Sequence, residues 1–146
     1  MNGADLTNAN LTNANLAGVD LTGANLIGVF GQLTTGPFTL PLGYIEVNHY
    51  IVGPGVNLTG ADLNGVDLTG ANLNGVFGQL LASPTALPPG YIVVNNHIVG
   101  PGVKLAGVNL TGVDLTGADL TNANLTLSHT HISEPTRRYA NSYAVL

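Results

Sequence analysis

The carboxylate and imidazole side chains are the groups of this sequence with the most chemical potential. Each aspartate stands immediately before a leucine, at Asp5, Asp20, Asp62, Asp67, Asp114 and Asp119. A row of such carboxylates would attract cationic partners. His129 and His131 alternate near Glu134, which is the spacing of a two-histidine metal site on a strand. At the end of a chain such a pair is more often incidental. No Ser-His-Asp set or phosphate-binding loop accompanies these groups, so we expect no catalysis, metal or cofactor.

The composition narrows the classes of partner. Charged residues make up 8% of the 146 residues, against about 25% in ordinary domains. The three cations are Lys104, Arg137 and Arg138, and the net charge is −5. Phosphate backbones are bound by clustered Lys and Arg, so direct nucleic acid binding is not expected. The sequence has no cysteine, no basic leader and no long apolar run, which favours a cytoplasmic protein without a membrane segment.

A five-residue repeat must position these groups. A small apolar residue is followed two positions later by a large one in 18 pentads, six in each of three blocks. All 18 small positions hold Ala, Val or Ile, and four large positions hold Gly. The other large positions form the predicted core: Leu6, Leu11, Leu16, Leu21, Leu26, Leu58, Leu63, Leu68, Leu73, Leu105, Leu110, Leu115, Leu120 and Leu125. Two inward residues flanking one outward residue describe a short extended side, and the residues after it supply a corner.

Segments such as Ala-Asn-Leu-Ala-Gly at 14–18 and Ala-Asp-Leu-Asn-Gly at 61–65 resemble the pentapeptide-repeat family, and the Phe-Gly-Gln-Leu segments resemble its cyanobacterial members. The resemblance implies an all-β fold, a right-handed quadrilateral parallel β-helix with four pentads per coil. Eighteen pentads then give about 4.5 coils and a column about 22 Å tall. Its packed interior leaves no room for a small-molecule substrate. We expect a solenoid over residues 1–127 and a separate tail over 128–146.

Two 17-residue insertions, 34–50 and 81–97, interrupt the repeat at an offset of 47 residues. In each, two β-prone runs flank a dipeptide, Asn48-His49 or Asn95-Asn96, which predicts a hairpin with a primed turn. Six pentads are one and a half coils. If the hairpins do not alter the phase, they leave the column on opposite sides.

The same numbering puts Asp5, Asp62 and Asp119 on one face and Asp20 and Asp114 on a neighbouring face. Family members that inhibit DNA gyrase imitate duplex DNA, so this acidic edge is one functional hypothesis. Duplex DNA carries one charge per about 1.7 Å, far more than this edge offers. Thr follows a leucine of the repeat at nine positions (7, 12, 22, 59, 69, 111, 116, 121 and 126), so an ice-binding surface is a minor alternative. Thr also simply suits the exposed side of a strand.

The ends of the solenoid are the last candidate site. Ser133-Glu134-Pro135 reads as a helix start, and Tyr139, Tyr143 and Leu146 fall at helical spacing beyond it. A short C-terminal helix would cover the last coil or form a dimer contact. The first pentads show no cap, and an uncapped solenoid end templates pairing with another chain. We therefore expect a structural scaffold that self-associates as a dimer or end to end, with an unidentified protein partner as the alternative.

Overall fold

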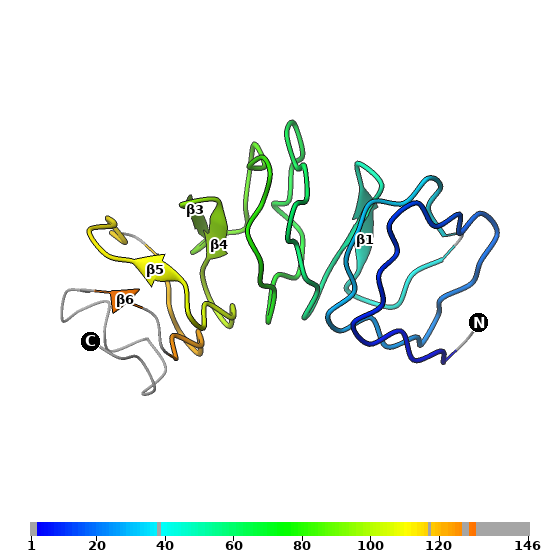
Figure 1. Cartoon of the computed structure of the whole chain (residues 1–146), viewed down its shortest axis with the longest axis horizontal. Helices are drawn as coiled ribbons and strands as arrows, with labels where there is room; N and C mark the ends of the chain where they lie inside the picture. Colours follow the sequence, from blue (N-terminus) through cyan, green and yellow to red (C-terminus); the bar gives the residue numbers. More distant parts are fainter. Residues whose placement is uncertain (1–2, 38, 117, 127–128, 131–146) are drawn as a thin grey trace.

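The computed structural model describes residues 3–37, 39–116, 118–126 and 129–130. Within these ranges the regular elements are short strands, with no helix (Figure 1). They are β1 (Ile45–Val47), β2 (Tyr50–Val52), β3 (Ile92–Val94), β4 (His97–Val99), β5 (Asn109–Leu110) and β6 (His129–Thr130). The predicted C-terminal helix and the end interface Tyr139, Tyr143 and Leu146 lie outside the described residues. β6 pairs with β5, so strand pairing continues past residue 127.

Parallel pairing between residues about 20 apart organises the chain. Bridges join Asp5 to Asn25, Asn10 to Phe30, Asn57 to Phe77, and Lys104 to Asn124, and β5 pairs with β6 at the same separation. Twenty residues are four pentads, and such a stretch is here called one pass around the column. The chain therefore winds as a β-helix-like column in which each pentad pairs with the pentad four positions earlier.

One stack of pentads can be followed through both insertions. The Asn57 amide donates to the Val29 carbonyl at 3.0 Å, which places Asn57 beside Phe30, and the Lys104 amide donates to Val76 at 2.9 Å. The members of this stack, here called the Asn10 stack, are Asn10, Phe30, Asn57, Phe77, Lys104 and Asn124. The steps along it are alternately 20 and 27 residues.

The 47-residue module therefore returns the chain to the same stack after two passes. Asn10, Asn57 and Lys104 are equivalent, and so are the two hairpins: the Leu33 amide donates to His49 and the Leu80 amide to Asn96. The expectation that the hairpins leave opposite sides is wrong. The reason is that each hairpin adds length within a pass and so shifts the phase of the pentads after it.

Much of each insertion belongs to the column. Thr35 and Thr39 bridge to Asn15 and Asp20, and Ala82 and Ala86 bridge to Asp62 and Asp67. Because the residues around Thr35 are polar and do not follow the pentad pattern, this part of the column was not predicted from the sequence. A long pass contains 27 residues where a regular one contains 20, so only about seven residues are additional, and these build the hairpin.

Each hairpin is an antiparallel pair closed by a two-residue turn. β1 pairs with β2 and β3 with β4, each over three residues. The turn residues have positive φ throughout, 47° and 64° at Asn48 and His49, and 47° and 59° at Asn95 and Asn96. Positive φ at both central residues defines the primed turn that matches the twist of a hairpin, so this prediction is confirmed.

The leucine ladder is buried, and the first hairpin divides it. Thirteen of the fourteen predicted core leucines are buried, while Leu6 in the first pass is partly exposed. Consecutive residues of β2 serve different cores: Ile51 packs with the N-terminal cluster and Val52 with the cluster that extends to Leu125. Figure 1 shows the passes arranged along an arc, with the hairpins between successive passes. Each hairpin is thus a wedge built into the column.

Tyrosine rings explain two of the glycines that replace leucine. A Cβ on Gly53 would lie 2.3 Å from the Tyr44 ring, and one on Gly100 would lie 2.2 Å from the Tyr91 ring. The Tyr44 hydroxyl donates to Pro54 at 2.7 Å, and that of Tyr91 to Pro101 at 2.8 Å. The ring fills the space that a leucine side chain would occupy and fastens the base of each hairpin.

Candidate binding surface

The outward aspartates and asparagines serve the corners of the column. The Oδ1 atom of Asp5 accepts from the Thr7 amide at 3.0 Å, and that of Asn10 from the Thr12 amide at 2.9 Å. The same contact recurs from the first pass to Thr126. Asp and Asn are interchangeable here because both offer an oxygen to the amide two residues on. This corner contact accounts for the regular spacing of the aspartates without any partner.

Threonine hydroxyls reinforce these corners. The hydroxyls of Thr12, Thr59 and Thr126 donate to the asparagine two residues earlier at 2.6 Å. Several other threonine hydroxyls donate to the aspartate two residues earlier in the same way. The hydroxyl protons of these residues are therefore directed at their own corners, which gives the threonines a local structural role.

These contacts favour the ionised carboxylates. The hydroxyl of Thr22, then that of Thr39 and the Thr22 amide, lower the pKa of Asp20 to about 2. The hydroxyl and amide of the threonine two residues on also lower the pKa of Asp5, Asp67, Asp114 and Asp119. These groups remain negatively charged at neutral pH.

The structure groups the aspartates differently from the sequence numbering. Asp20, Asp67 and Asp114 follow Asn10, Asn57 and Lys104 by two pentads, so they share one stack. Asp5 and Asp119 share another, and Asp62 belongs to a third together with Asn15. The predicted groupings of Asp5 with Asp119 and of Asp20 with Asp114 agree with these stacks, whereas the placement of Asp62 is wrong because the hairpins shift the phase. Charges on the Asp20 stack recur once in two passes, about 10 Å or more apart, which is sparse beside duplex DNA.

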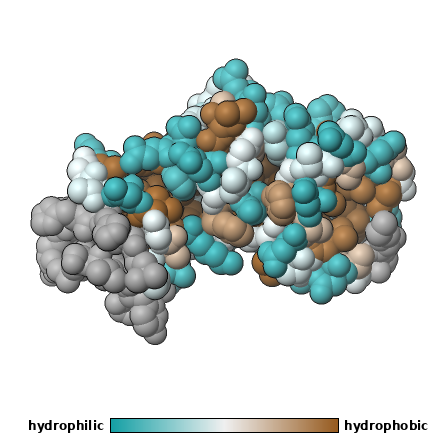
Figure 2. Space-filling view, viewed as in Figure 1, coloured by the Kyte–Doolittle hydropathy of each residue, from teal (hydrophilic) through white to brown (hydrophobic). Residues whose placement is uncertain are grey.

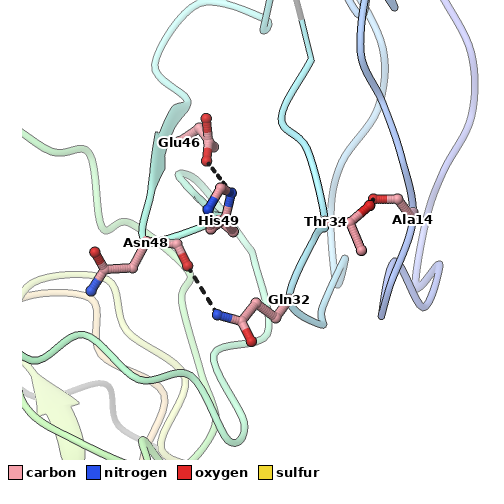
Figure 3. A network of polar contacts seen from close by, with 6 residues as sticks. All are labelled: Ala14, Gln32, Thr34, Glu46, Asn48 and His49. Carbon is pink, nitrogen blue, oxygen red and sulfur yellow. Dashed lines mark hydrogen bonds and ion pairs between the residues drawn. The ribbon is translucent and has the colours of Figure 1, made fainter.

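The tip of the first hairpin is tied to the passes on both sides of it. Gln32 Nε2 of the preceding pass donates to the Asn48 carbonyl at 3.3 Å (Figure 3). Toward the following pass, Asn48 Nδ2 donates to Asn64 O at 3.2 Å. His49 Nδ1 lies 3.5 Å from Glu46 Oε1. The wedge is therefore held by side chains where the backbone ladder is interrupted.

The tip of the second hairpin has the same backbone and different side chains. Asn96 Nδ2 donates to Leu80 O at 3.2 Å, and Asn95 Nδ2 to Asn109 O at 3.5 Å. His97 Nδ1 lies 2.8 Å from the Asn95 carbonyl. Beside this tip is an open cavity of about 360 Å³ lined by Phe77, Gly78, His97, Lys104, Ala106 and Val108. Lys104 Nζ lies 5.5 Å from the centre of the Phe77 ring.

This cavity was not predicted from the sequence. Its residues come from two successive passes and from a hairpin, and they are brought together by the 27-residue step. The available signal was the one lysine of the chain, which replaces Asn57 at an offset of 47 residues.

The metal hypothesis falls outside the described structure, because nothing is described of the side chains of His129, His131 and Glu134. Among the described residues no group of three or more His, Asp and Glu side chains could hold a metal ion. In the same part of the chain, no helix has the length and apolar character needed to cross a membrane.

The column of parallel-paired pentads defines a class of repeat protein, and comparison with family models identifies it. The model for pentapeptide repeats matches in eight copies at residues 1–30, 54–76 and 102–129. These residues are more than half of the chain, which therefore belongs to the pentapeptide-repeat family. The two gaps in the match contain the hairpins. No curated protein and no solved structure matches the chain.

Proposed function

We propose that this chain is a right-handed quadrilateral β-helix that serves as a non-catalytic scaffold and associates with further copies of itself through the N-terminal end of the column. The pentapeptide-repeat family suggests a protein-interaction scaffold. Bridges four pentads apart support the four-sided coil. The six members of the Asn10 stack support a column with more coils than the 4.5 expected from the sequence.

The observation that carries self-association is the open edge of the first pass. In the bridge between Asn10 and Phe30, the Phe30 amide donates to Ala9 and the Phe30 carbonyl accepts from Leu11. The amide and carbonyl of Asn10 itself therefore face the other way, toward the end of the column. Among the described residues they have no partner, and the same holds for Asp5, Asn15 and Asp20. Both donors and acceptors are present, so two first passes can pair head to head.

Incomplete burial marks the same end. Leu11 and Leu16 are each 8% exposed to solvent, whereas Leu63 and Leu120 are fully buried. Ala4 and Leu6 are also only partly buried. Figure 2 shows hydrophobic residues among polar ones over these passes. Docking of a second copy would cover this apolar surface together with the unpaired backbone groups.

The test is the solution mass at several concentrations. We expect the mass to rise above the monomer value of 14.9 kDa as the concentration increases. The double variant Asn10→Pro, Asn15→Pro removes two amides that face the open end and should remain monomeric, because proline cannot donate to a ladder. The matched control Asn10→Ala, Asn15→Ala loses the same corner contacts and keeps both amides, so it should still associate. A wild-type mass of 14.9 kDa at every concentration would contradict the proposal.

A second candidate, modulation of a DNA-handling enzyme such as gyrase, draws on the Asp20 stack, whose ionised aspartates form a row of like charge. It ranks second because the charges are sparse. Salt-sensitive binding to purified gyrase, lost when Asp20, Asp67 and Asp114 are all replaced by Asn, would support it. Binding unchanged by these substitutions would contradict it.

A further inference from the structure

The cavity beside the second hairpin differs in chemistry from the same place in the first module. His97 stands where the first module has Tyr50, and Lys104 stands where it has Asn57. Ala106 replaces Thr59, whose hydroxyl donates to Asn57 in the first module. These exchanges remove a hydroxyl, shorten an aromatic side chain and introduce a positive charge.

Lys104 supplies a positive charge that no carboxylate of the described residues balances locally. It is the one cation among the described residues, in a chain of net charge −5. Within that part of the chain no carboxylate lies within ion-pair distance of Lys104. The ammonium instead lies over the Phe77 ring at 5.5 Å. The cavity thus joins one exposed cation to an aromatic wall.

His97 adds a hydrogen-bonding group of known polarity. Its Nδ1 atom lies 2.8 Å from the Asn95 carbonyl, and a carbonyl only accepts. Nδ1 must therefore carry the proton, and Nε2 of the neutral ring is left as an acceptor. A ligand beside His97 can donate a hydroxyl or amide proton to this nitrogen.

We propose that this cavity binds a small aromatic carboxylate, with the carboxylate at Lys104, the ring against Phe77 and Val108, and a ring hydroxyl at His97. One ammonium balances one carboxylate. A phosphate dianion would call for several convergent donors, such as a nest of backbone amides. The volume of about 360 Å³ suits a ligand of this size and is at the lower end for small-molecule sites.

The proposal can be tested by nuclear magnetic resonance titration of the full chain with 4-hydroxybenzoate and its neutral amide, 4-hydroxybenzamide. We expect amide shifts confined to the lining residues and a dissociation constant of about 1 mM for an open site with one charge. The neutral amide should bind about tenfold more weakly, in line with one lost charge-assisted contact. Lys104→Met should bring the carboxylate down to the level of the amide.

Two further variants control this test. Asn10→Ala changes the equivalent position two modules earlier, where it pairs with Phe30 and not with the cavity lining, and should leave binding unchanged. Ala106→Trp should fill the cavity and abolish binding of both compounds, with the remaining spectrum showing that the fold is intact. Carboxylate binding of equal strength in Lys104→Met, or no shifts up to about 10 mM ligand, would overturn the proposal. Neither result depends on self-association, which is measured by mass.

Discussion

The two hairpins share a frame and differ at their tips. β1–β2 and β3–β4 have the same register, the same positive-φ turn and the same tyrosine packed on glycine at the base. At the tips, Glu46 Oε1 and His49 Nδ1 lie 3.5 Å apart in the first hairpin, whereas Val93 and Asn96 occupy these positions in the second. The shape of the wedge therefore depends on the base of the hairpin, while the residues at the tip are free to vary. Variation between copies marks the tips as the surface where binding properties can differ.

The largest effect is expected at the shared base. Gly53→Ala and Gly100→Ala would each place a methyl group within 2.3 Å of a tyrosine ring. Overpacking of this kind should lower the free energy of unfolding by about 3 kcal/mol, equally in both modules. Chemical denaturation measures it. Gly70→Ala is the control, since no atom lies within 4 Å of a Cβ there. If Gly53→Ala were as mild as Gly70→Ala, the base would not hold the wedge.

Removing the tyrosine hydroxyls should have a smaller and again equal effect. Tyr44→Phe and Tyr91→Phe each lose a hydrogen bond to a proline carbonyl, worth about 1 kcal/mol of unfolding free energy. Burial raises the pKa of both tyrosines, and the charge of Asp119 adds to the effect at Tyr91, so both hydroxyls keep the proton they donate. Denaturation of both variants beside Tyr50→Phe, which loses no hydrogen bond in the described structure, checks this. Clearly unequal losses would show that the two bases are not equivalent.

At the tips the modules should respond differently. His49 has a φ of 64°, a conformation that asparagine tolerates better, and Asn96 stands at the equivalent position. His49→Asn should raise the free energy of unfolding by about 0.5 kcal/mol, because the exposed contact with Glu46 that it loses is worth little. The reverse change, Asn96→His, should destabilise the second hairpin. Destabilisation by His49→Asn would assign the contact between His49 and Glu46 a larger role.

The smallest expected effect concerns Asp20 and its equivalent Asp67. Asp20 receives a hydrogen bond from Thr39, but Ala86 stands opposite Asp67 and cannot donate one. Because the pKa of Asp20 is lowered to about 2, the group stabilises the fold above its unfolded pKa of about 3.9. This contribution is lost as the pH falls from about 4 toward 2. Thr39→Ala should raise the pKa of Asp20, as measured by carboxyl resonances. An unchanged pKa would show that Thr39 does not contribute.

The repeat predicted most of the column, because a rule that applies at every fifth residue tolerates local exceptions. The repeat predicted correctly that Leu21, Leu63 and Leu120 lie in the core, and the turn dipeptides predicted the positions of both hairpins in the sequence. The phase after each hairpin could not be predicted, because it depends on how many inserted residues pair with the preceding pass. Thr35 and Thr39 pair with that pass although the pentad pattern is absent around Thr35. The cavity at Lys104 depends on this phase, so it could not be predicted from the sequence either.

Each hairpin shifts the phase of the pentads, so that the chain returns to the same stack after 47 residues. The sequence has no cysteine, so an engineered pair reports on this directly. Neighbouring strands lie about 4.8 Å apart, within the range for a disulfide. We expect Phe30→Cys with Asn57→Cys to oxidise to an intramolecular disulfide, and Phe30→Cys with Asp67→Cys to remain as free thiols. Disulfide formation by the second pair and not by the first would contradict the account, because it would mean that the hairpins leave the phase unaltered.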